Sequence, residues 1–315
     1  MNIKGLLFAL LGFAMFSTHD VVVKFLGATY SPIQIIFFAS LISFPLVTFM
    51  LITDPTRENI RPVHPWWVLA RVLASLTAGL CAFYAFSVLP LAQVYTLLFA
   101  APLLITVLAI PMLGEQVGRH RWAAVLVGLV GVIVVLRPGA GAGLNLGHLG
   151  ALTAAFASAF ASVVVRKIGR EERAVVLMLY PHATNFLLMG AALPFVYVPM
   201  PLMEFAGVGT IALLGFIAAL CIIFAYRYGE AAIVAPMQYS QIIWASIFGW
   251  LLFGESLDLP TLIGAGLIIL SGLYIVFRET RSGVSRNTPV LRNRSRLFSP
   301  GSFRASTVLR RWNSQ

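Results

Sequence analysis

The chain has 315 residues, of which 59% are hydrophobic and 10% charged, and its formal net charge is +11. Because an average soluble domain is about 25% charged, this composition excludes an ordinary soluble globular protein. Apolar stretches long enough to cross a bilayer as helices recur along the chain, and their connections are too short to hold a soluble catalytic domain.

Ten transmembrane helices are predicted from these stretches, so the expected fold is an all-α polytopic membrane protein. The helices are expected over residues 4–26, 32–52, 66–89, 92–113, 121–137, 147–168, 174–198, 206–228, 232–253 and 259–277. The first stretch is too long for the apolar core of a signal peptide, and we expect it to remain as helix one.

The positive charge is concentrated at the C-terminus. Residues 278–315 contain nine arginines and one glutamate, and therefore supply +8 of the net +11. This segment is rich in Ser, Asn and Arg and lacks an apolar stripe, which indicates a disordered tail attracted to anionic lipid headgroups. The remaining body carries only +3, and binding to nucleic acid is not expected.

The distribution of Lys and Arg predicts the orientation of the helices. With the N-terminus in the cytoplasm, the connections that contain Arg57, Arg119, Arg166 and Arg227 all lie on the cytoplasmic side, together with the tail. This is the positive-inside pattern, so both termini are expected on the cytoplasmic side of the membrane.

An internal repeat divides the chain into two halves. The Val-Val-Val-Lys sequence at 21–24 corresponds to Val-Val-Val-Arg at 163–166, and Gly-Glu at 114–115 corresponds to Gly-Glu at 254–255. The offsets stay between 140 and 142 residues along about 115 residues, which favours duplication over chance. We therefore expect a first five-helix repeat over 1–138, a glycine-rich linker over 139–146, a second repeat over 147–278 and the tail over 279–315.

An odd number of helices in each unit places the two units in opposite orientations. Inverted repeats supply two related conformations, one open to each side, and this is the geometry of alternating access. The alternative is a duplication that only enlarged a helical bundle, with no transport.

The pattern resembles the drug/metabolite transporter superfamily, in particular its EamA-like ten-helix exporters. The resemblance covers about residues 4–278, and its most specific stretch contains Arg-Val-Leu at 71–73, Phe-Tyr-Ala-Phe at 83–86, Leu-Pro-Leu-Ala-Gln at 89–93 and Leu-Gly-Glu at 113–115. Helix two has Phe-Phe-Ala-Ser at 37–40, where many relatives have an arginine.

The resemblance implies a secondary exporter of small organic solutes, and this chain looks most similar to amino-acid exporters, including the aromatic amino-acid branch. The alternatives are a broad-specificity drug or metabolite carrier of the same fold, for example for S-adenosylmethionine or riboflavin, and a non-transporting membrane sensor. No enzyme motif, metal site or cofactor site is found in the sequence, and a monomer is expected.

Helix one contains three charged or titratable residues near its C-terminal end, His19, Asp20 and Lys24. Polar side chains at membrane depth are costly and normally face a cavity or a partner. Asp20 and Lys24 are four residues apart and are predicted to pair on one helix face. Two interpretations stay open, a structural pair or gate, and handling of substrate or protons by His19 and Asp20.

Helices four and nine provide the clearest candidates for a substrate pathway. Gln238, Gln241 and Trp244 are spaced by three residues and are predicted to share one face that is too polar to contact lipid. Lining of the pathway and amide bridges between helices are the two interpretations of this face. Pro102 and Pro236 are predicted to weaken their helices and to allow bending.

A zwitterionic amino acid requires hydrogen-bond donors, an acceptor for its ammonium group and apolar walls. The predicted substrate-binding residues are Phe16, His19, Asp20, Tyr84, Tyr95, Phe99, Ser158, Gln238, Gln241 and Trp244. The predicted gating or structural residues are Lys24, Arg71, Pro102, Glu115, Pro236 and Glu255.

The orientation gives a direct prediction. Green fluorescent protein fused after Arg278 is expected to fluoresce, and alkaline phosphatase fused there to be inactive. Ten helices return the chain to the cytoplasmic side on which it began. Paired alkaline phosphatase and green fluorescent protein fusions measure this, with fusions in the 139–146 linker as the control for the opposite side. An extracytoplasmic reporter after Arg278 would contradict the helix count.

Overall fold

The computed structural model describes residues 3–52, 61–115, 117–137, 145–169, 171–172, 174–228 and 234–280, and in these residues it contains helices and no strands. Most of the expected linker and nearly all of the expected basic tail lie outside the described residues. The helices are α1 (Ile3–Gly27), α2 (Pro32–Ile52), α3 (Pro65–Val88), α4 (Leu91–Leu98), α5 (Ala101–Leu113), α6 (Arg119–Leu136), α7 (Leu146–Ile168), α8 (Ala174–Ala192), η1 (Leu193–Phe195), α9 (Leu202–Tyr228), η2 (Ala235–Ser240), α11 (Gln241–Phe253) and α12 (Leu259–Thr280).

The helices follow the predicted apolar stretches, and seven spans in the described residues are long and apolar enough to cross a membrane. Within the predicted spans, the structure differs from regular helices in three places. The fourth helix is divided into α4 and α5, the ninth begins as the 3-10 helix η2 before it continues as α11, and the seventh ends at Ala192 and is followed by η1.

A proline accompanies each of these irregularities. Pro102 is in the first turn of α5, where its ring cannot donate the backbone hydrogen bond that would continue α4. Pro236 is in the first turn of η2, and Pro194 is in η1. Pro102 therefore lies at the α4–α5 interruption, and Pro236 lies at the start of η2 in the corresponding helix of the second half.

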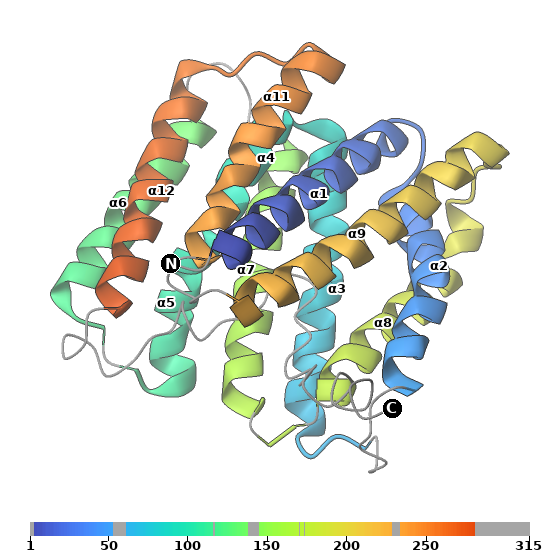
Figure 1. Ribbon diagram of the computed structural model, residues 1–315, viewed down its shortest axis with the longest axis horizontal. Helices are drawn as coiled ribbons and strands as arrows, with labels where there is room; N and C mark the ends of the chain where they lie inside the picture. Colours follow the sequence, from blue (N-terminus) through green and yellow to red (C-terminus); the bar gives the residue numbers. More distant parts are fainter. Residues whose placement is uncertain are drawn as a thin grey trace.

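The two halves are interleaved in the bundle. The first helix of the first half, α1, packs along α9 of the second half, and α7 packs in the same way along α3 (Figure 1). These pairs exchange under the internal repeat, since α1 corresponds to α7 and α3 to α9. The last helices of the halves, α6 and α12, lie side by side (Figure 1).

The C-terminal ends of α1 and α7 lie at opposite ends of α3, and these two contacts define the two ends of the bundle. Lys24, near the C-terminal end of α1, donates a hydrogen bond to the carbonyl oxygen of Leu89 just beyond α3. The ammonium group of Lys167, near the C-terminal end of α7, lies over the ring of Trp67 at the start of α3. Trp67 and Leu89 are about 33 Å apart along the helix axis. We call these ends the Lys24 end and the Arg166 end.

Close glycine contacts hold α6 and α12 together. A Cβ atom on Gly264 would lie 2.6 Å from the carbonyl oxygen of Gly131, and one on Gly131 would lie 2.8 Å from that of Gly264. Small residues allow backbones to approach within a membrane, where helix association depends on packing. In contrast, a Cβ atom on Gly266 of the same helix would meet no atom within 4 Å.

We expect Gly264→Ala to lower the free energy of unfolding by about 1–3 kcal/mol, because backbone atoms cannot move aside as a flexible side chain can. Thermal unfolding in detergent, followed by tryptophan fluorescence, measures the change. Gly266→Ala is the matched control and is expected to be neutral or slightly stabilising. Equal melting temperatures for both variants would contradict the close approach of α6 and α12.

Candidate functional site

A group of polar side chains connects α1, α4 and α11 inside the bundle. His19 Nδ1 lies 2.8 Å from Asp20 Oδ1, and the side chains of both residues are 13% exposed. The hydroxyl of Tyr95 on α4 donates a hydrogen bond to Asp20 Oδ2. Gln241, the first residue of α11, donates from Nε2 to the Tyr95 hydroxyl at 3.4 Å. We call these four residues the Asp20 cluster.

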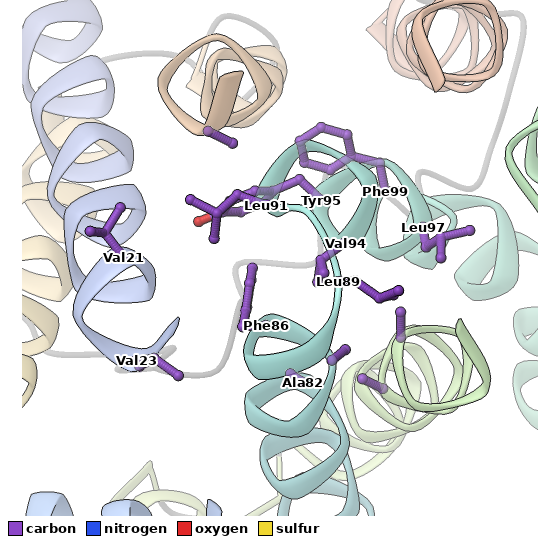
Figure 2. Packing of buried hydrophobic residues seen from close by; sticks show 14 of the residues in the cluster. Val21, Val23, Ala82, Phe86, Leu89, Leu91, Val94, Tyr95, Leu97 and Phe99 are labelled. Carbon is purple, nitrogen blue, oxygen red and sulfur yellow. The ribbon is translucent and has the colours of Figure 1, made fainter. Parts of the chain in front are cut away.

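The position of Tyr95 explains how the two halves share this cluster. Figure 2 shows Tyr95 extending from α4 toward α1, where Val21 and Val23 are labelled. Tyr95 is 2% exposed and Gln241 is also 2% exposed. Asp20 and Tyr95 belong to the first half and Gln241 to the second, so the cluster is built at the contact between the halves.

Several buried polar atoms next to the cluster have no hydrogen-bond partner among the described residues. They are Ser240 Oγ, Gln241 Oε1 and Trp244 Nε1, all at the junction of η2 and α11. An unpaired buried polar atom costs about 1–3 kcal/mol, and such atoms usually indicate a water or ligand that completes the bonding. An amide acceptor on Gln241 and, one turn farther along α11, an indole N–H donor on Trp244 are therefore available to a bound molecule.

Aromatic rings surround the cluster. The ring of Phe83 on α3 packs edge-on against His19 with 6.0 Å between centroids, and Phe86 packs against Tyr95 at 5.3 Å. Phe99 contacts both Tyr95 and Tyr239, at 6.1 Å and 5.0 Å. These rings offer apolar walls and π-faces next to one carboxylate, which suits an organic cation.

The structure distributes the predicted substrate-binding residues over several places. His19, Asp20, Tyr95 and Gln241 come together, and Phe99, just after α4, contacts Tyr95. Trp244 lies one turn after Gln241 on α11. Phe16 packs with the apolar side chains of α1 and α9 around Phe13 and Ala225. Gln238 is a half-buried residue of η2, and the Ser158 hydroxyl donates to the carbonyl oxygen of Ala155 in its own helix at 3.0 Å.

Tyr84 lies on another side of α3 than the sequence led us to expect. Its ring is next to Gly150 of α7, and it lines a cavity of about 660 Å³ with Leu136, Asn145 and His148. In the described part of the chain, no contact connects Tyr84 with the Asp20 cluster. The neighbouring Phe83, which the prediction did not include, contacts His19 instead.

The predicted pair of Asp20 and Lys24 was wrong. Lys24 Nζ lies 2.6 Å from Glu255 Oε1, across the contact between the halves. Asp20 instead bonds to His19 and Tyr95. Lys24 is one turn nearer than Asp20 to the C-terminal end of α1. Glu255, which follows α11, lies at this end and is therefore within reach of Lys24.

The other predicted gating or structural residues also connect separate elements. Arg166 on α7 donates to Glu115, which follows α5, and Arg71 on α3 donates to the carbonyl oxygen of Leu177 on α8. The glycines that precede the two glutamates, Gly114 and Gly254, have φ angles of 68° and 64°. Only glycine adopts this left-handed conformation at low cost, so each Gly-Glu pair ends its helix and turns the glutamate back toward the bundle.

The crossed ion pairs were detectable in the sequence. Lys24 corresponds to Arg166 and Glu115 to Glu255 under the repeat, so any contact between Lys24 and Glu255 predicts a contact between Arg166 and Glu115. The signal in the sequence is that the repeat places a cation at both 24 and 166 and a carboxylate at both 115 and 255. No comparable pattern in the sequence indicated Phe83, Ser240 or Tyr239.

Comparison with known proteins agrees with this architecture. The EamA-like transporter family matches the chain twice, over residues 3–137 and 145–277. The chain belongs to this family. It is therefore a multi-pass membrane transporter and not an enzyme.

Two relatives of known role span nearly the whole chain. An S-adenosylmethionine uptake transporter of Rickettsia bellii is 24% identical over 282 residues, which are 88% of this chain and 95% of that protein. A pseudopaline exporter of Pseudomonas aeruginosa is 26% identical over 284 residues, which are 89% of this chain and 98% of that protein. A solved crystal structure has the same fold, with a TM-score of 0.56 and 17% identity over 86% of this chain and 94% of that chain.

We expect Gln241→Ala and Trp244→Ala each to reduce transport at least tenfold while the protein stays folded, because each removes a polar atom that has no partner inside the protein. Size-exclusion chromatography and initial rates in proteoliposomes measure the two effects. Ser246→Ala is the matched control on the same helix, since the Ser246 hydroxyl bonds to the carbonyl oxygen of Ile242. Transport at the wild-type rate in both site variants would remove α11 from the site.

Proposed function

We propose that the protein is a secondary transporter that exports small amino-acid-like metabolites by alternating access, and that the Asp20 cluster binds the cationic group of the substrate. The observation that carries the proposal is the position of this cluster. A largely buried carboxylate, a tyrosine and a glutamine from both halves meet beside the two interrupted helices.

The interrupted helices support binding at this place. Broken membrane helices expose backbone groups and helix ends at membrane depth, and transporters of several folds bind substrates there. The α4–α5 interruption follows Leu98, and the η2–α11 junction is at Ser240 and Gln241. Because the two junctions correspond under the repeat, movement of one half relative to the other changes the side to which the site opens.

The chemistry of the site supports an amino-acid group as ligand. The Asp20 carboxylate accepts hydrogen bonds from an ammonium group, and the indole N–H of Trp244 and the hydroxyl of Ser240 donate to a carboxylate. Phe99 and Phe83 provide walls for an apolar or aromatic side chain. The small number of fixed charges favours a range of related substrates over one.

A second candidate substrate is S-adenosylmethionine. It is an α-amino acid that also bears a sulfonium cation and a heteroaromatic base. A relative is named as an uptake transporter for this compound. A carboxylate surrounded by aromatic rings suits a sulfonium as well as an ammonium group, because both are attracted to the π-face and to the negative charge.

The charge distribution supports the remaining features of the proposal. The excess of Lys and Arg in alternate connections predicts that both termini lie in the cytoplasm. The bacterial origin of the relatives supports a bacterial inner membrane. The sequence provides no ATP-binding motif, so uphill transport requires an ion or substrate gradient.

The test is counterflow in proteoliposomes loaded with one of three probes, S-adenosylmethionine, S-adenosylhomocysteine or a mixture of the twenty amino acids, with and without an imposed pH gradient. The homocysteine compound lacks the methyl group and the sulfonium charge of S-adenosylmethionine, so this pair isolates recognition of the cation. We expect saturable counterflow of at least one cationic or zwitterionic probe, and a loss of at least tenfold in Asp20→Asn.

Ser246→Ala again provides the control for reconstitution. Saturable counterflow that is unchanged in Asp20→Asn would contradict binding at the Asp20 cluster. Absence of counterflow for every probe would contradict the proposed class of substrate.

A further inference from the structure

Two ion pairs connect the halves of the protein at opposite ends of the bundle. Lys24 of the first half pairs with Glu255 of the second half at the Lys24 end, and Arg166 of the second half pairs with Glu115 of the first half at the Arg166 end. The pairs are exchanged by the internal repeat. Their remaining hydrogen-bonding atoms, however, have different surroundings.

At the Lys24 end, both members of the pair also bind backbone of the α3–α4 turn. Glu255 Oε2 accepts a hydrogen bond from the backbone N–H of Leu91 at 2.9 Å, and Lys24 Nζ donates to the carbonyl oxygen of Leu89 at 2.5 Å. Leu91 is the first residue of α4, whose N–H has no partner within the helix. The pair therefore fixes the start of α4, and α4 packs against α11.

At the Arg166 end, the corresponding atoms are unused. Glu115 Oε2 and Arg166 Nη1 are buried and have no hydrogen-bond partner among the described residues. The side chain of Glu115 is 7% exposed and that of Arg166 is 10% exposed. Among the described residues, Glu255 Oε2 thus accepts a backbone N–H, whereas the equivalent carboxylate of Glu115 accepts only from Arg166.

This difference has an energetic consequence. A buried carboxylate oxygen without a partner is unfavourable, and hydrogen bonds to charged groups contribute about 1.5–3 kcal/mol. Because the halves are related by the repeat, a conformation with the bonding exchanged between the two ends has a similar energy. Each pair then stabilises closure of its own end, and only one end is fully bonded at a time.

We propose that Glu255 and Glu115 are positioning residues of the transport cycle that alternately fix the two ends of the pathway. With Lys24, Glu255 holds the Lys24 end closed in the conformation described here. Glu115 is already paired with Arg166 here, and in the opposite conformation the remaining atoms of this pair gain hydrogen bonds and hold the Arg166 end closed. This proposal rests on the proposed alternating access and adds the residues that set its equilibrium.

The test measures distances between spin labels at both ends of the reconstituted protein, in a background with Cys81→Ala and Cys221→Ala. Val88→Cys and Ser256→Cys report the Lys24 end, and Lys4→Cys and Arg119→Cys report the Arg166 end, since all four side chains are exposed. We expect Glu255→Ala to increase the ratio of open to closed populations at the Lys24 end about tenfold.

The symmetry-related variant provides the decisive comparison. We expect Glu115→Ala to change the same ratio about tenfold in the opposite direction, because it weakens the competing conformation. A purely structural role would destabilise the protein without such opposite shifts. The exchanged pair Lys24→Glu with Glu255→Lys is expected to restore the wild-type ratio. If an alanine variant does not fold, Glu255→Gln and Glu115→Gln provide the same comparison with the side-chain shape retained.

Shifts of opposite sign in the two variants support the proposal. Shifts of the same sign, or unchanged distance distributions in both, overturn it. Counterflow by the wild-type protein tests the proposed function separately, so a transporting protein whose variants do not shift refutes the positioning role alone.

Discussion

Polar groups inside a bilayer must find their partners within the protein, and this constraint organises the structure. Asp20 is satisfied by His19 of its own helix and by Tyr95 of α4, and Tyr95 in turn binds Gln241 of α11. In a medium of low dielectric constant, separation of these groups would leave a charged oxygen without compensation. The cluster therefore adds polar contacts between three helices that also pack through apolar side chains.

The same constraint explains the ends of the bundle. The carboxylates of Glu115 and Glu255 are turned inward by left-handed glycines, and each meets a cation from the other half. Such pairs contribute little when fully exposed to water, but these are mostly buried, and loss of one partner leaves the other charge isolated. The two halves are thus tied by charge at both ends and by the Asp20 cluster between them, while the α6–α12 glycine contact holds their last helices.

The sequence predicted the helices well and the interruptions poorly. Hydropathy depends on the apolar side chains alone, and these continue through Phe99 and Ala100 without a break, so residues 92–113 were interpreted as one helix. Pro102 was recognised as a point of bending, but its position in the first turn of α5 follows from backbone hydrogen bonding that composition does not reveal. Pro236 lies in the first turn of η2, and hydropathy does not distinguish this 3-10 helix from the helix expected over 232–253.

The candidate site was predicted in part, and the reason is geometric. The cost of polar groups at membrane depth indicates His19 and Asp20, and residue spacing, which fixes the side chains that share a helix face, indicates Gln241. Spacing does not reveal which face meets which neighbouring helix, so Tyr84 was preferred to Phe83, and Lys24 was paired with Asp20 within α1 although its partner, Glu255, comes from the other half. The repeat contained the missing information, because it relates both ion pairs to each other.

The central claim is that two units of five helices cross the membrane in opposite directions and share one site. Single cysteines at Gly118 and Ser256, which are exposed and follow the two Gly-Glu pairs, test it most directly. A membrane-impermeant maleimide is applied to intact cells in the background without Cys81 and Cys221. The account predicts labelling of Ser256→Cys from outside and of Gly118→Cys only after permeabilisation. Labelling of both from the same side would contradict it.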